Sequence, residues 1–302
     1  MPDNIQYHGA KQVSANGLQI TYDSFGKLKD PVIILIMGLG TQMIHWNDEF
    51  CKLLASHMFR VIRFDNRDIG KSTWMVNSPV PSMWDFIGNG LLGKKVNAPY
   101  LLDDMADDTV ALMDVLNINK AHVVGASMGG MIAQCIALKY PDRAVSLTSI
   151  MSTTGNRSLP KAKKRVSAKL LKPLAKEIDQ YVAQSLDIWK VLHGDHFAFD
   201  AERVEKVIRD SRQRGFNPDG VARQLSAIID SPDRTQHLGQ LQIPSLVIHG
   251  DIDPLVPVEC GIATAAAIPN ARLKIMKGMG HTLPFQLWPQ IVDDIVAITR
   301  AG

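Results

Sequence analysis

The chain has 302 residues, of which 46% are hydrophobic and 21% are charged, as is ordinary for a globular protein with a sizeable core. The formal net charge of +3 is too small to indicate nucleic-acid binding, and no apolar run is long enough to span a membrane. The first residues lack the basic and apolar regions of a secretory signal. We therefore expect a cytoplasmic protein, made of one large α/β domain or two small ones.

The three cysteines, Cys51, Cys135 and Cys260, lie far apart and form no C-x-x-C pair. Two of them fall in apolar helical patterns. This distribution favours small core residues in a reducing compartment and gives no support to a zinc site.

The first third of the chain predicts strands and one helix. Residues 11–25 indicate an antiparallel hairpin, because Asn16-Gly17 is a strong two-residue turn signal and apolar residues alternate after it. Residues 31–36 form a continuous apolar run, typical of a strand covered on both faces. The following segments are a glycine loop at 37–40, a helix at 46–57, a strand at 60–64 and a polar loop at 65–72.

Residues 74–100 form a long irregular segment that is rich in apolar side chains. We expect such a loop to pack over another part of the molecule. Its large apolar members are Trp74, Met75, Trp84, Phe86, Ile87, Leu91 and Leu92.

Strands and helices then alternate up to residue 151. The pattern predicts a helix at 102–116 with acids near its start, a strand that leads into Gly125, a helix to about Tyr140 and a strand at 144–151. Strands joined by helical crossovers imply a mainly parallel sheet with helices on both faces.

Residues 155–240 read as entirely helical, and strand patterns return at 245–248 and 272–276 before a last helix at 289–299. We therefore predict an α/β core of residues 1–153 and 241–302, with residues 154–240 inserted as a helical cap over the carboxyl edge of the sheet. Between Arg157 and Lys176 there are eight basic residues and no acid. A solvated basic face over an apolar underside (Val166, Leu170, Leu174) is the expected explanation, and steering of anionic substrates is the alternative.

Gly125-Ala126-Ser127-Met128-Gly129 fits the nucleophile-elbow pattern G-x-S-x-G. A serine at a strained strand-to-helix turn has its hydroxyl pushed out into a site. Glycines two residues before and after it remove side chains that would collide where strand and helix pass close together. The alternative is an ordinary glycine-rich turn.

A serine hydroxyl needs a base, and the imidazole of that base needs an orienting carboxylate. His281, in a loop of small residues after the last predicted strand, is the candidate base. Asp251 and Asp253 both follow the preceding strand. We favour Asp253, which lies further out before a proline, and expect Asp251 to stabilise the turn. The order Ser127, Asp253, His281 is the one expected for α/β-hydrolases.

A tetrahedral oxyanion needs two backbone N–H donors, for which we predict Met128, at the start of a helix, and Leu39, in the glycine loop.

Gly38, His45 and Trp84 are candidates for the substrate pocket. We expect His122 and His249 to be packed and hydrogen-bonded. Asp65 is an alternative carboxylate, although Asn66 and Arg67 beside it favour a structural hydrogen-bond cluster.

Together these motifs resemble the α/β-hydrolase superfamily over about residues 12–299. Within it, Ile36-Met37-Gly38, then Trp46-x-Asp48-Glu49-Phe50 and Val61-Ile62-Arg63-Phe64-Asp65-x-Arg67-Asp68, are most similar to aclacinomycin methylesterase and related bacterial carboxylesterases. Met37 stands where many members have histidine before the oxyanion glycine. The resemblance implies a mostly parallel eight-stranded sheet, helices on both faces and a helical cap before the last strands.

The leading hypothesis is a cofactor-free and metal-free serine hydrolase that cleaves a small carboxylic ester, with an apolar moiety, through an acyl-enzyme. Proline iminopeptidases, carbon–carbon bond hydrolases and perhydrolases share the triad and stay open as alternatives, whereas an aspartate at the elbow, used by dehalogenases and epoxide hydrolases, is absent. A non-catalytic receptor with this fold is the alternative of another class. The sequence does not specify the oligomeric state.

Overall fold

The structure, a computed structural model, describes residues 4–82, 84–86, 95–170 and 172–301. Within this part, eight strands form one sheet in the order β1-β2-β4-β3-β5-β6-β7-β8. β1 and β2 are antiparallel additions at one edge, and every pair from β4 to β8 is parallel. The strands are β1 (Tyr7–Ala15), β2 (Leu18–Phe25), β3 (Val32–Ile36), β4 (Arg60–Phe64), β5 (Ala121–Ala126), β6 (Ala144–Ile150), β7 (Ser245–Gly250) and β8 (Arg272–Met276).

Helices cover both faces of the sheet, so the predicted fold class is confirmed. The side chains of β3 alternate between two buried clusters, with Ile33 and Leu35 in one and Ile34 and Ile36 in the other. Helices α1 (Asp48–Ala55) and α10 (Trp288–Thr299) pack on the first face, and α2 (Leu102–Val115) and α3 (Met128–Lys139) on the second. Both faces are therefore dry, which explains the continuous apolar run in this strand.

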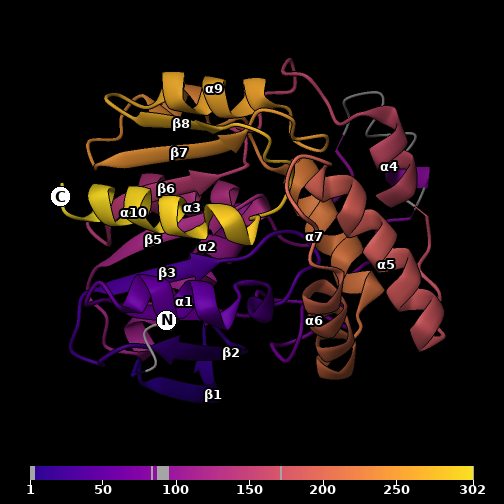
Figure 1. Cartoon of the computed structure of the whole chain (residues 1–302), viewed down its shortest axis with the longest axis horizontal. Coiled ribbons are helices and arrows are strands. Elements are labelled where there is room, and N and C mark those ends of the chain that lie inside the picture. The colour runs from indigo at the N-terminus through magenta and orange to yellow at the C-terminus, as the bar shows by residue number, and fades with distance from the viewer. Residues whose placement is uncertain (1–3, 83, 87–94, 171, 302) are drawn as a thin grey trace.

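The helical insert, residues 154–240, lies between β6 and β7. Figure 1 shows its helices α4–α7 beyond the arrowheads of the strands, at the carboxyl edge of the sheet. They are α4 (Lys164–Leu170), α5 (Ile178–His193), α6 (Ala201–Arg214) and α7 (Pro218–Asp230), followed by the short α8 (Thr235–Leu238). Its treatment as a separate unit with these bounds stays a prediction.

A buried ion pair fastens α7 to the core. Arg223 donates two hydrogen bonds to Asp68 at 2.7 and 2.8 Å, and neither side chain is more than 1% exposed. Tyr100 donates a further bond to the same carboxylate at 2.7 Å. Burial alone raises the pKa of Asp68, but these bonds outweigh burial and hold that pKa below its usual value. The insert is thus joined to the loop after β4 through a desolvated charge network.

Several local features differ from the sequence-based expectations. The helix expected at 46–57 is shorter than predicted: α1 covers Asp48–Ala55 and follows a 3-10 turn at Met43–His45. It begins where the Asn47 side chain accepts the N–H of Glu49. Helix α9 (Val258–Ala267) was not expected, because its small residues show no apolar periodicity. No helix of the described chain is both long and apolar enough to cross a membrane.

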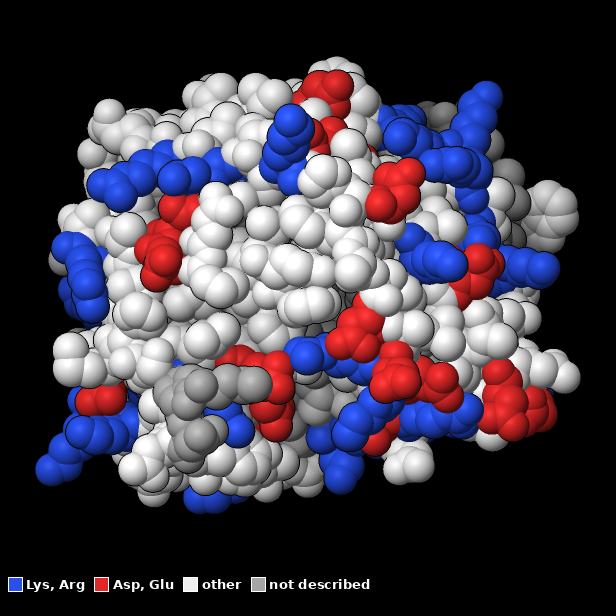
Figure 2. Space-filling model, in the orientation of Figure 1, with Lys and Arg blue, Asp and Glu red and all other residues white. Residues whose placement is uncertain are grey.

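Two expectations about apolar side chains are only partly met. Leu170 on α4 is 40% exposed although Val166 on the same helix is buried, so the underside of the basic segment is only partly covered. The exposed basic residues of this segment gather over α4 in Figure 2. Met75 packs against the core as expected, and Trp74 is 36% exposed with its Nε1 donating to the carbonyl of Gly70 at 3.1 Å, whereas Trp84 is 80% exposed. Ile87, Leu91 and Leu92 lie outside the described residues.

Candidate active site

Ser127 lies at the sharp turn between β5 and α3. Its backbone has φ 56° and ψ −120°, a combination that residues other than glycine rarely adopt. A Cβ on Gly125 would lie 2.0 Å from the carbonyl oxygen of Gly129, and a Cβ on Gly129 would lie 2.0 Å from that of Ile36. Both glycines are therefore required because backbone approaches backbone at the turn, as the sequence pattern predicts.

The structure brings the three predicted triad residues together from distant parts of the chain. His281 Nε2 lies 3.0 Å from Ser127 Oγ, and His281 Nδ1 lies 2.6 Å from Asp253 Oδ2. Asp253 and His281 are both buried, with 5% and 7% exposure. A carboxylate on Nδ1 favours the tautomer that leaves Nε2 free to accept the proton of the serine hydroxyl.

The second oxygen of Asp253 is held by backbone. Asp253 Oδ1 accepts the N–H groups of Leu255 and Val256, each at 2.9 Å. These two donors fix the carboxylate so that Oδ2 faces His281. Asp251 instead accepts the N–H of Gly278 at 2.6 Å, and so has the turn-stabilising position expected for it.

His249 lies beside the pair without belonging to it. Its Nε2 is 2.8 Å from the carbonyl oxygen of Val256 and 3.6 Å from Asp253 Oδ2. Burial lowers the pKa of His249, with the Val256 carbonyl opposing the shift, so the ring stays neutral near pH 7. A neutral ring leaves the Asp253 carboxylate without a competing cation.

The loop that carries His281 is clamped by the end of helix α5. The N–H of His281 donates to the carbonyl of Leu192 at 2.6 Å, and His193 Nδ1 lies 2.9 Å from the hydroxyl of Thr282. A Cβ on Gly280 would lie 2.2 Å from the Leu192 oxygen. Sequence reasoning missed Leu192 and His193, because nothing local in α5 signals a contact some 90 positions away.

The two predicted oxyanion donors lie near Ser127. Met128 is the first residue of α3, where helix N–H groups have no intrahelical acceptor and the helix dipole favours negative charge. A Cβ on Gly38 would lie 3.1 Å from Ser127 Cβ, so the glycine loop that contains Leu39 passes directly over the serine. The arrangement can support nucleophilic attack on a carbonyl and stabilise the resulting anion.

Three other predicted residues have defined surroundings. His45 stacks on Trp189 of α5 with ring centroids 5.3 Å apart, and burial lowers its pKa to about 4. His122 is packed and hydrogen-bonded as expected, with Nδ1 2.9 Å from Ser146 Oγ. Trp84 is 80% exposed. The assignments of Gly38, His45 and Trp84 to a substrate pocket stay predictions.

Asp65 belongs to a structural cluster. It accepts the N–H groups of Met43 (2.8 Å) and Lys71 (3.0 Å) and pairs with Arg214 of α6. Burial raises the pKa of Asp65, and Arg214 opposes that shift. The cluster was expected around Arg67, but Arg67 instead pairs with Asp108 on α2 at 2.6 Å.

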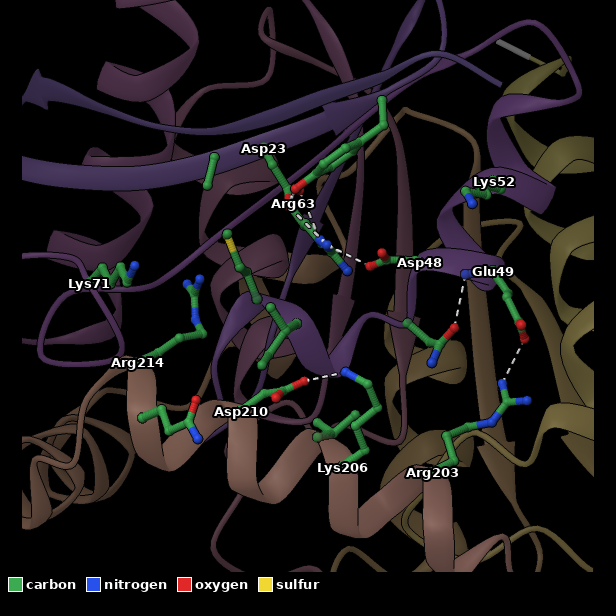
Figure 3. Close-up of a pocket in the computed structure, with 17 residues that line it drawn as sticks. Asp23, Asp48, Glu49, Lys52, Arg63, Lys71, Arg203, Lys206, Asp210 and Arg214 are labelled. Carbon is green, nitrogen blue, oxygen red and sulfur yellow. Dashed lines mark hydrogen bonds and ion pairs between the residues drawn. The ribbon is translucent and has the colours of Figure 1, made fainter. Parts of the chain in front are cut away.

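A separate pocket of about 750 Å³ lies between α6 and the first turn of α1 (Figure 3). None of the three residues predicted for the triad lines it. Most of the charged side chains that line it form ion pairs with one another, such as Arg203–Glu49 at 2.7 Å and Lys206–Asp210 at 2.6 Å. Arg63 bridges Asp23 and Asp48 at the back. This pairing makes the pocket a polar junction between the insert and the core.

Comparison with known proteins agrees with the fold. The family profile described as "alpha/beta hydrolase fold" matches residues 31–286, and the chain therefore belongs to that family. Rhodomycin D methylesterase DauP from Streptomyces sp. (strain C5) is 27% identical over 97% of this chain and 98% of its own length. 3-Oxoadipate enol-lactonase 2 from Acinetobacter baylyi is 26% identical over 90% of each chain.

Solved structures show the same fold. The 2-hydroxy-6-oxo-6-phenylhexa-2,4-dienoate hydrolase from Rhodococcus sp. strain RHA1 superposes with a TM-score of 0.76 at 18% identity, covering 98% of this chain and all of its own. The expected resemblance to the methylesterase group is confirmed by the sequence matches. The protein is a hydrolase of the α/β-hydrolase family.

Proposed function

We propose that this protein is a serine carboxylesterase that needs no cofactor. Ser127 attacks the ester carbonyl while His281, oriented by Asp253, takes the hydroxyl proton. The N–H groups of Leu39 and Met128 stabilise the oxyanion, and His281 then protonates the leaving alcohol. Water repeats these steps on the acyl-enzyme and releases the acid.

The observation that carries this proposal is the continuous relay from Ser127 Oγ through His281 to Asp253, with separations of 3.0 and 2.6 Å. These distances are within hydrogen-bond reach of a nucleophile, its base and the orienting carboxylate. Two relatives of this chain are named for ester substrates, a methylesterase and an enol-lactonase, which supports an ester substrate. The substrate is a small molecule with an apolar part.

The proposal is tested with purified protein on p-nitrophenyl esters of increasing acyl length, alongside a proline naphthylamide and a ring-cleavage dienoate. We expect turnover of the esters and stoichiometric labelling by a fluorophosphonate. Ser127→Ala should abolish labelling and lower kcat by about 10⁶-fold, since the residual rate comes from the oxyanion hole and binding alone. Near-full turnover by Ser127→Ala would refute the assignment. Preferential cleavage of the amide or the dienoate would replace the ester as substrate class, and an unlabelled, inactive protein would indicate a receptor.

A further inference from the structure

Gln224 of helix α7 is fully buried and joins the insert to the glycine loop. Its Oε1 accepts the N–H of Gly40 at 3.0 Å, and its Nε2 donates to the carbonyl of Arg67 at 2.8 Å. One side-chain amide thus uses both ends to connect two core loops that flank the site. Gly40 is the residue directly after Leu39, whose N–H is a proposed oxyanion donor.

The two peptide planes on either side of Leu39 are each held by hydrogen bonds, one from Thr41 in the same loop and one to Gln224 of the insert. The carbonyl of Gly38 accepts the N–H of Thr41 at 3.3 Å and the Thr41 hydroxyl at 2.9 Å. In a trans peptide the N–H points opposite to the carbonyl, so this pair of bonds turns the Leu39 N–H away from Thr41. The next plane contains the Gly40 N–H, which Gln224 holds.

The anchor of Gln224 is itself rigid. Its neighbour Arg223 makes the buried ion pair with Asp68, and Asn217 at the start of α7 donates to the Asp68 carbonyl at 3.0 Å. A Cβ on Gly220 would lie 2.4 Å from that same oxygen, so α7 sits directly on the loop after β4. Side chains locked by packing and by further hydrogen bonds can hold a catalytic group to within a few tenths of an ångström.

We infer that Gln224 is a positioning residue, which keeps the Leu39 N–H aimed at the oxyanion. The inference rests on the proposed serine esterase activity and extends it, because it makes the helical insert part of the oxyanion hole. An oxyanion donor acts mainly in the transition state, and losing one costs about 10²–10³ in kcat. A loop that is released but still present should lose less than a deleted donor.

The test replaces Gln224 with Met, which has a similar volume and neither hydrogen bond. We expect kcat on a p-nitrophenyl ester to fall by at least about tenfold with KM nearly unchanged. The inhibition constant for an alkylboronic acid, whose tetrahedral adduct carries an oxygen in the oxyanion position, should rise by a similar factor. Ser226→Ala is the matched control, because Ser226 is equally buried on α7 and donates only to the Arg223 carbonyl at 2.7 Å. It should keep the wild-type kcat.

A kcat and boronate affinity equal to wild type in Gln224→Met would overturn the inference, as would an equal loss in Ser226→Ala. Should the Met variant fail to fold, Gln224→Ser carries the test, because water can enter the polar space that it leaves. It should lose kcat with KM retained, and a wild-type kcat would again refute the inference. Failure of the proposed function is distinguishable, since the wild-type protein itself would then show no turnover and no fluorophosphonate labelling.

Discussion

Replacing Asp253 with asparagine should move the proton of the His281 ring from Nδ1 to Nε2 without changing the position of the ring. Asp253 Oδ1 accepts two N–H groups, so the single amide oxygen of Asn is required on that side. The NH₂ group must then face His281 Nδ1, which now lies 2.6 Å from Asp253 Oδ2. Because NH₂ can only donate, Nδ1 becomes the acceptor and the proton moves to Nε2. That proton faces Ser127 Oγ and prevents general-base action.

The expected loss in kcat is about 10⁴-fold, as for the same change in a serine-protease triad, and this equals about 5.4 kcal/mol of transition-state stabilisation. Steady-state hydrolysis of a p-nitrophenyl ester measures it. Asp251→Asn is the matched control, since that carboxylate accepts only the Gly278 N–H among the contacts described for it, and its kcat should stay within a few-fold of wild type. A kcat above one tenth of wild type in Asp253→Asn, or an equal loss in Asp251→Asn, would refute the tautomer argument.

Two further predictions concern stability. Arg223→Met should lower the free energy of unfolding by about 3–5 kcal/mol, because it leaves the buried Asp68 carboxylate without its cation. Urea denaturation measures the change, and a loss below 1 kcal/mol would contradict it. Burial lowers the pKa of His122 to about 4, so below pH 6.5 the unfolded chain binds a proton that the folded chain excludes. Stability should therefore fall as pH falls, by about 2 kcal/mol between pH 7 and 5 from this group. His122→Asn should reduce that dependence, and an identical pH dependence in the two proteins would argue against a buried neutral ring.

The parts of the site that sequence predicted are those with local causes. The need for Gly125 arises within the turn itself, at the Gly129 carbonyl, whereas Gly129 makes room for the Ile36 carbonyl of the adjacent strand β3. The positions of His281 and Asp253 follow from strand ends that meet at one edge of a parallel sheet. Such constraints can be read from spacing and residue type, so fold class and triad candidates could be inferred from the sequence.

The parts of the site that the sequence did not predict depend on contacts between segments far apart along the chain. Gln224 and Leu192 reach the site through helix packing that no pattern in α5 or α7 encodes. The pairing of Arg67 illustrates the same limit. Its place in a polar loop predicted a cluster with Asp65, but that carboxylate is satisfied by Arg214 from the insert, and Arg67 finds Asp108 on α2. Which partner a buried charge takes is decided by tertiary geometry.

The bond from the His281 N–H to the Leu192 carbonyl bears on how enzymes with this architecture can be recombined. A chimaera that exchanges the insert for that of another hydrolase would replace the substrate-contacting residues of the insert. It would also remove the Leu192 carbonyl that accepts the His281 N–H at the end of α5. The graft would then change turnover and selectivity together. Retaining Leu192 and His193 at the end of helix α5 from the host, and transplanting only the segments between such anchor points, would separate the two effects.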